Sequence, residues 1–139
     1  MIRKSTVNDI DMIMDIWLST NINAHSFISD EYWKNQFEEV RTAILEAEVY
    51  VFEDGVIKGF VGIIENYIAG IFVKEEFQAQ GIGKELIQFL QNFKSELILN
   101  VYEKNKKAVN FYIKNNFKIS QKRNEEETNH MEYQMIWKR

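Results

Sequence analysis

The chain has 139 residues, enough for one hydrophobic core and short for two, so we expect a single domain spanning 1–139. Hydrophobic residues make up 45% of it, and no apolar run approaches the roughly 20 residues that cross a bilayer. With no cysteine there are no disulfides or thiolate metal sites, and a net charge of −4 with scattered cations argues against nucleic acid as a partner. The start, Met1–Ser5, lacks the apolar core of a secretory signal, which favours a cytoplasmic protein with no membrane partner.

The first third of the chain predicts one short strand and two helices. The strand is expected at Ile2–Lys4, and the helix after it is capped by Ser5 or Thr6. The second helix is capped by Ser29 or Asp30. Both helices carry apolar residues at helical spacing. These residues are Ile10, Ile13, Met14, Trp17 and Leu18 in the first helix and Trp33, Phe37, Val40 and Ile44 in the second.

The middle of the chain changes to the period of strands. Val49–Glu53 and Val56–Glu65 form a predicted hairpin around Asp54-Gly55, because glycine accepts the positive φ of a tight turn. A further strand is expected at Ala69–Val73, where Gly70 allows either a bulge or close approach of a ligand. An amphipathic helix follows at Ile82–Phe93. Its expected core stripe is Ile82, Leu86, Phe89, Leu90 and Phe93.

The segment between that strand and that helix, Gln78–Lys84, contains two glycines at a helix start. Such a turn lets the backbone approach a ligand, and its free N–H groups and the helix dipole favour phosphate oxygens. A P-loop would need glycine at Gln78 and Ser or Thr at Glu85, and a dinucleotide fingerprint would need glycine at Leu86. The spacing therefore predicts a phosphorylated ligand of another kind.

The last third predicts a strand at Leu97–Tyr102, a helix at Lys106–Asn115, and closing strands at Lys118–Lys122 and Met131–Lys138. The order of elements gives a mixed α/β sheet with helices on both faces.

Two motifs carry a resemblance to a known family. The pattern Gln78-x-x-Gly81-x-Gly83 after a strand resembles the pyrophosphate motif of the GCN5-related N-acetyltransferases (GNAT), although Ala79 stands where many members have glycine. The stretch from Asn105 to Phe117 is similar to the family's Asn-x-x-Ala-x-x-Phe-Tyr-x-x-x-x-Phe signature. The resemblance extends over essentially the whole chain and is strongest to small bacterial acetyltransferases.

This resemblance implies the GNAT fold, a mostly antiparallel mixed sheet of about seven strands flanked by about four helices, with two central strands that splay apart. It also implies acetyl-CoA as co-substrate, held by the backbone of one splayed strand, the glycine turn and the asparagine motif. The expected contacts are Ile71, Phe72, Val73, Gln78, Ala79, Gln80, Gly81, Ile82, Gly83, Lys84, Asn105, Ala108 and Tyr112. The two histidines are far apart in sequence and give no metal signature, so no metal is expected.

The implied reaction is attack of an amine on the acetyl-CoA carbonyl. The resemblance points to Tyr112 as the acid that protonates the leaving thiolate. Relatives that acetylate protein N-termini often carry a glutamate base where this chain has Asn100, and an amide is no base. The base candidates are His25, Glu65 and Tyr102; the alternative for His25 is an exposed loop residue, and for Glu65 a solvated charge.

Two loops are expected to flank the acceptor site, Asn21–Ile28 and Arg123–His130, and the second carries Glu125-Glu126-Glu127. This negative run favours a cationic amine, which a protein or peptide lysine and a small polyamine both satisfy. A non-catalytic acyl-CoA sensor with the same fold is the alternative. The oligomeric state, monomer or homodimer, stays open, and we expect Trp33 and Tyr133 to be exposed aromatics that serve a dimer or the acceptor groove.

Overall fold

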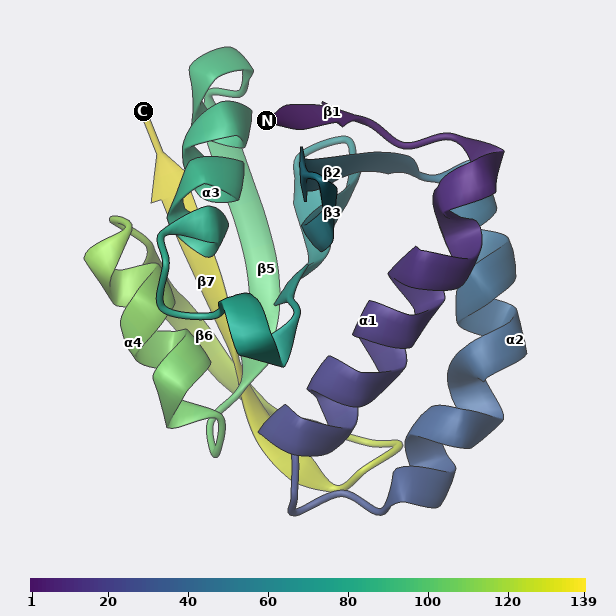
Figure 1. The fold of residues 1–139 in the computed structure, drawn as a ribbon. Coiled ribbons are helices and arrows are strands. Elements are labelled where there is room, and N and C mark those ends of the chain that lie inside the picture. Colours follow the sequence, from purple (N-terminus) through teal and green to yellow (C-terminus); the bar gives the residue numbers. More distant parts are fainter.

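A seven-stranded sheet runs through the molecule with two helices on each face (Figure 1). The computed structural model describes residues 1–139. The strands are β1 (Ile2–Lys4), β2 (Glu48–Asp54), β3 (Val56–Ile64), β4 (Tyr67–Val73), β5 (Glu96–Tyr102), β6 (Lys118–Glu125) and β7 (His130–Lys138), and the helices are α1 (Ile10–Ala24), α2 (Asp30–Glu46), α3 (Ile82–Phe93) and α4 (Lys106–Lys114). The strand order is β1-β2-β3-β4-β5-β7-β6, and only β4 and β5 pair in parallel. The expected mixed, mostly antiparallel sheet is confirmed.

Two hydrophobic cores lie on opposite faces of this sheet. The core under α3 and α4 includes Leu86, Leu90 and Phe117, and the core under α1 and α2 includes Ile13 and Phe60. None of the four helices combines a membrane-spanning length with a sufficiently apolar sequence. The amphipathic stripes of the sequence therefore position the helices on the two faces.

Three aromatic side chains differ from their expected exposure. Phe93 is 49% exposed, because it lies at the end of α3, where its aromatic neighbours are Tyr50 and Phe89; the fully buried Ile87 completes the stripe instead. Trp33 was expected at the surface but is buried between α1 and α2. Tyr133 is half-buried and packs against the core under α3 and α4.

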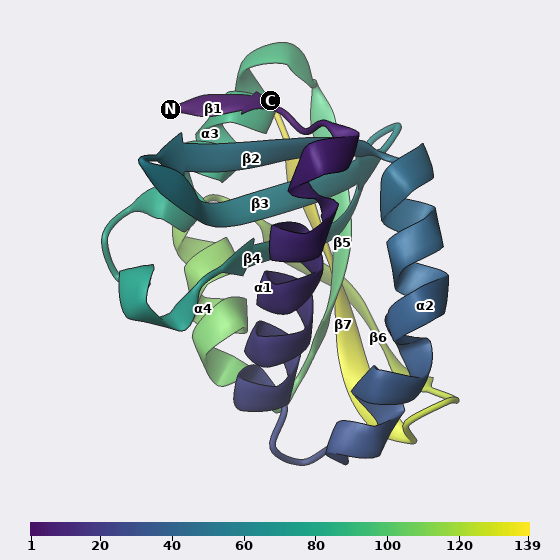
Figure 2. The same ribbon diagram turned by 45° about the vertical axis from the view of Figure 1, so that its right-hand side comes forward.

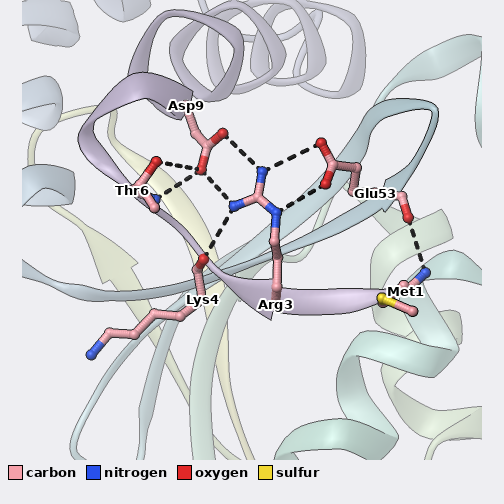
Figure 3. A network of polar contacts seen from close by, with 6 residues as sticks. All are labelled: Met1, Arg3, Lys4, Thr6, Asp9 and Glu53. Carbon is pink, nitrogen blue, oxygen red and sulfur yellow. Dashed lines mark hydrogen bonds and ion pairs between the residues drawn. The ribbon is translucent and has the colours of Figure 1, made fainter.

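The first helix begins later than expected, because the short 3-10 turn η1 (Val7–Asp9) precedes it. The N–H of Thr6 donates to Oδ2 of Asp9 at 2.8 Å. Arg3 grips the same carboxylate through Nη1 and Nη2 at 2.8 and 3.0 Å, and its Nε donates to Glu53 of β2 at 2.9 Å (Figure 3). The hydrogen bonds from Arg3 lower the pKa of Asp9 to about 2.

The C-terminal hairpin is longer than the sequence indicates. β6 continues to Glu125 and β7 begins at His130, so the loop expected at Arg123–His130 is reduced to a short turn. An ion pair between Arg123 Nε and Glu132 Oε1, at 2.9 Å, joins the two strands at the start of the expected loop. Seven of the eight β6 residues are exposed, so no hydrophobic alternation marks this edge strand.

The centre of the sheet splays open. β3 and β4 pair along their length except for a bulge, where the register passes from Gly62 opposite Gly70 to Ile63 opposite Ile68 and leaves Ala69 as the extra residue. β4 and β5 pair only through Tyr67 with Ile98 and Ile68 with Leu99. Figure 2 shows β2 and β3 running across the view while β5, β7 and β6 run down it. The splayed strands that the resemblance implied are present.

Candidate functional site

The turn before α3 has the conformation of an anion cradle. Gly81 is the N-cap of α3 with φ +85°, and Ala79 also has positive φ, at 62°. The N–H groups of Ile82, Gly83 and Lys84 have no intrahelical acceptor, and no side chain caps them. A Cβ on Gly81 would meet nothing within 4 Å, so the turn is open on that side. These residues fit the phosphates of coenzyme A.

Other side chains hold this turn in place. Gln78 donates from Nε2 to the Val73 carbonyl at 2.9 Å and accepts from Lys107 Nζ at 3.0 Å, so it joins the end of β4 to α4. A Cβ on Gly83 would lie 3.1 Å from the ring of Phe111, which shows that this glycine allows α3 and α4 to pack closely. The two motif glycines therefore have different tasks: Gly81 supplies the backbone conformation and Gly83 the close helix packing.

The opening between the splayed strands leads away from the turn along β4. Beyond Ile68, β4 is paired only on its β3 side, so the other backbone edge of Ile71–Val73 is free of partners from β5. The ring of Phe72 folds back over Gly70, where a Cβ would lie 2.3 Å from it. Gly70 therefore makes room for the protein's own aromatic ring beside the bulge.

Tyr112 lies on α4 with its ring among the aromatic rings of Phe111 and Phe117. The residue is 8% exposed, and its hydroxyl has no hydrogen-bond partner in the chain. Burial raises the pKa of this phenol, which keeps it protonated throughout the neutral range.

Asn105 caps the same helix, because its Oδ1 accepts from the Ala108 N–H at 3.2 Å. Its Nδ2 lies 3.2 Å from Nε2 of His25, a residue 80 positions earlier. The His25 ring is half-buried, and burial lowers its pKa to about 4. His25 is thus neither an exposed loop residue nor a histidine with a free Nε2.

Tyr102 sits at the end of β5 next to the same histidine, with ring centroids 5.2 Å apart. Its hydroxyl donates to Oε1 of Glu125 at 3.3 Å, and burial raises its pKa to about 12. Asn100, one pleat earlier on the same face, donates to the Tyr67 hydroxyl at 3.3 Å, while its Oδ1 is buried without a partner.

Glu65 lies apart from these residues. It occupies the exposed turn between β3 and β4, with φ 57°, next to the point where β4 and β5 still pair. The Ile98 N–H donates to the Asn66 carbonyl at 2.9 Å and closes that end of the opening. The structure therefore separates Glu65 from Tyr102, His25 and Tyr112, which stand on elements bordering the open end.

Sequence reasoning missed three residues at this site. Tyr67 faces Asn100 across the closed end of the opening, and Glu132 is a buried carboxylate on β7, directly opposite Tyr102 in the strand register. Tyr32 of α2 donates to Glu127 at 2.8 Å and so fixes the turn between β6 and β7. None of the three carried a sequence signal, because their contacts join segments that are distant in the chain. No group of three or more His, Asp or Glu side chains is arranged to hold a metal ion.

A helix start with free N–H groups beside two splayed strands is suited to a phosphorylated ligand with an extended arm. Residues 45–119 match the family model described as the acetyltransferase (GNAT) domain. The chain is 36% identical to peptidyl-lysine N-acetyltransferase YiaC of Escherichia coli K12, over 99% of this chain and 96% of YiaC. The chain therefore belongs to the GNAT family and is an acetyl-CoA-dependent N-acetyltransferase.

Solved structures agree with this assignment. The solution structure of apo YjaB from Escherichia coli superimposes with a TM-score of 0.87 at 25% identity, covering 99% of this chain and 96% of YjaB. The PaiA N-acetyltransferase of Thermoplasma acidophilum, solved with coenzyme A, has a TM-score of 0.83 at 22% identity, covering 100% and 98% of the two chains. The second likeness concerns the fold alone.

Proposed function

We propose that this enzyme transfers the acetyl group of acetyl-CoA to the side-chain amine of a lysine in a protein or peptide. The observation that carries the proposal is the opened sheet, which has the phosphate cradle on one side and Tyr102, His25 and the acidic β6–β7 turn on the other. The relatives YiaC and YjaB, both named peptidyl-lysine N-acetyltransferases, support a lysine as acceptor.

The donor side of the site is assigned to the turn and the splayed strand. The N–H groups at the start of α3, together with Gln78–Gly81, hold the phosphates, and the free edge of Ile71–Val73 pairs with the amides of the pantetheine arm as an added strand would. Asn105 and Ala108 fix the beginning of α4 beside that arm.

The chemistry requires one proton to leave the amine and one to reach the sulfur. The amine nitrogen bonds to the carbonyl carbon, the C–S bond breaks, and the thiolate takes the proton of Tyr112. The pKa of Tyr112 lies above that of a thiol, so the proton moves uphill and a hydrogen bond to the sulfur does part of the work.

Among the base candidates, Tyr102 has the best geometry for accepting a proton from the attacking amine. The Tyr102 hydroxyl donates its proton to Glu125. When the Tyr102 oxygen takes a proton from the amine, its own proton therefore passes to the Glu125 carboxylate. In His25 the Nε2 lone pair is engaged by Asn105, and Glu65 stands at the closed end of the opening. Tyr102 is thus our candidate for the base, with Glu125 as its proton acceptor.

The β6–β7 turn supplies attraction for the acceptor. Glu125, Glu126 and Glu127 lie on or next to it, and Tyr32 and Thr128 hold two of these carboxylates in place. A fixed negative turn raises the local concentration of a cationic chain such as a lysine peptide.

The test is calorimetric titration with acetyl-CoA, followed by thiol release from the same protein with lysine peptides, polyamines and small amines. We expect binding, and release with lysine peptides. Release with polyamines alone would overturn the lysine assignment. Binding without release from any acceptor would favour the non-catalytic sensor, and the absence of binding would contradict the assigned donor site.

A further inference from the structure

One chain of hydrogen bonds crosses the active site from α1 to α4. The Asn21 carbonyl lies 3.1 Å from Nδ1 of His25, Nε2 of His25 lies 3.2 Å from Nδ2 of Asn105, and Oδ1 of Asn105 lies 3.2 Å from the N–H of Ala108. A carbonyl only accepts, so Nδ1 must carry the proton and Nε2 must be the acceptor. The Asn105 oxygen is used by Ala108, so its NH₂ group is the one that faces His25. Each of these three contacts therefore joins a donor to an acceptor.

Aromatic rings hold His25 in this orientation. Its ring stacks on Trp33 at 5.2 Å with an angle of 27°, and meets Tyr102 and Phe27 edge-on at 5.2 and 5.7 Å. The ring is therefore enclosed by residues of α2, of β5 and of the loop after α1. Since burial lowers its pKa to about 4, Nε2 stays unprotonated at neutral pH and its electron pair accepts from Asn105.

We propose that His25 is a positioning residue, which holds the Asn105 amide in its capping orientation and so ties the acceptor-side loop to the helix that carries Tyr112. The proposal rests on the proposed function in one respect, namely that Tyr112 donates the proton. It assigns His25 a task other than that of the base. The connection joins residues 25 and 105, and through the cap it fixes α4, on which Tyr112 lies seven residues further on.

Loss of the acceptor at residue 25 would leave the Asn105 amide free to turn. The orientation of the Asn105 amide that caps α4 would then compete with other orientations, and the first turn of α4 would be less well fixed. Small displacements of a catalytic group cost large factors in rate, so the effect falls on kcat more than on folding.

The kinetic test compares three variants in the acceptor assay that gives the highest wild-type rate. His25→Phe keeps a flat ring against Trp33 and removes both nitrogens; we expect kcat to fall about tenfold with little change in the thermal midpoint. His25→Gln offers an oxygen to Asn105 and should recover at least half of that loss on a logarithmic scale. Tyr50→Phe is the control, because its hydroxyl bonds Glu48 on β2, away from the opening, and kcat should not change. An unchanged kcat in His25→Phe, or no recovery in His25→Gln, overturns the positioning role.

A spectroscopic test needs no acceptor and separates this proposal from the proposed function. In ¹⁵N NMR of the imidazoles, His25 should be the neutral Nδ1–H tautomer at pH 7. The variant Asn105→Asp keeps a capping oxygen but places a carboxylate against Nε2, so the pKa of His25 should rise. An Nε2–H tautomer, or a His25 titration unchanged by Asn105→Asp, overturns the contact. If the tautomer and the titration behave as expected while no lysine peptide is acetylated, the proposed function fails and the contact stands.

Discussion

At the scale of residues, Tyr112 combines two properties that a proton donor needs. It is buried, so its phenol stays protonated, and its hydroxyl has no partner inside the chain, so its proton is not committed elsewhere. The ring itself packs against Phe111 and Phe117. The hydroxyl can therefore be removed with little effect on the packing.

We expect Tyr112→Phe to lower kcat at least tenfold while the affinity for acetyl-CoA stays within twofold. The measurements are steady-state thiol release and calorimetric titration. Tyr50→Phe is the control, because its hydroxyl bonds Glu48 on β2, away from the opening, and turnover should not change. Unchanged turnover in Tyr112→Phe would rule out the acid role.

Two glycines of this chain form a matched pair for testing the donor site. Gly81 and Gly55 both have positive φ, +85° and +77°, and a Cβ on either would meet nothing within 4 Å. Substitution by glutamate therefore imposes similar backbone strain, about 1 kcal/mol, at both positions. Only the carboxylate at position 81 stands at the start of α3.

Gly81→Glu should weaken acetyl-CoA binding at least tenfold, because its charge repels the phosphates, and Gly55→Glu should leave the affinity unchanged. Calorimetric titration of both variants measures this. Equal affinities would show that the turn is not the phosphate site.

Short-range features of the site were predictable from sequence, and long-range ones were not. The glycine turn before α3 and the start of α4 at Lys106 follow from local spacing, because both depend on neighbours within a few residues. The burial of His25 depends on Trp33, Tyr102 and Asn105, and nothing in the loop sequence around it indicates that these residues meet. For the same reason the position of Glu65 at the closed end could not be foreseen.

At the scale of elements, the N-terminal edge of the sheet is held by charge. Arg3 of β1 joins η1 to β2 by bonding Asp9 and Glu53 together (Figure 3). The Asp9 side chain is 11% exposed, whereas Asp54 in the ion pair with Lys58 is 75% exposed. These two aspartates therefore offer a comparison of a buried and an exposed ion pair.

Asp9→Asn should lower the free energy of unfolding by about 2 kcal/mol, because the partly buried Arg3 guanidinium then keeps only one of its two carboxylate partners. Asp54→Asn should change it by less than about 0.5 kcal/mol. Urea denaturation followed by circular dichroism measures both. A similar loss in the two variants would show that burial does not set the value of the Arg3 network.

Element boundaries were predicted well where periodicity is strong. The range of α3 agrees with the structure, because its apolar stripe faces the core over three turns. The extent of β6 was missed, because an edge strand with exposed residues on both faces carries no alternation. Its pairing with β7 is fixed by backbone bonds and by the Arg123–Glu132 ion pair instead.

At the scale of the whole molecule, stability should depend on pH in two separate windows. The pKa of His25 is lowered from 6.5 to about 4, so between these values the unfolded chain binds a proton that the folded one does not. Folding stability is therefore complete above pH 6.5 and falls as the pH drops toward 4. The pKa of Asp9 is lowered from 3.8 to about 2, so its contribution is lost in the same way below pH 3.8.

Between pH 6.5 and 4 we expect the free energy of unfolding to fall by about 2 kcal/mol, a figure reduced for the partial solvent exposure of His25. Thermal unfolding at half-unit pH steps from 7 to 4 measures it. In His25→Phe the slope between pH 6.5 and 4 should become shallower. The same slope in wild type and variant would assign the loss to other groups.

The overall topology came from the resemblance rather than from periodicity. Local patterns give strands and helices in order, but they do not say that β7 inserts between β5 and β6 or that β4 and β5 part after two residue pairs. These features depend on contacts between segments distant in the chain. The bulge at Ala69 is different, because a bulge was one of the two alternatives that the neighbouring Gly70 indicated.

The narrow join between β4 and β5 has a consequence for the lifetime of the protein. In the strand ladder only Tyr67 with Ile98 and Ile68 with Leu99 pair across the two halves of the sheet. A co-substrate held between the strands, as we propose, would bridge the two halves and bind the folded state alone. By mass action, a concentration one hundred times the dissociation constant adds about 2.7 kcal/mol to stability. Proteases cleave chains that have unfolded, so we expect the amount of enzyme to follow the supply of acetyl-CoA. When acetyl-CoA is scarce, the enzyme is then both slower and more rapidly degraded.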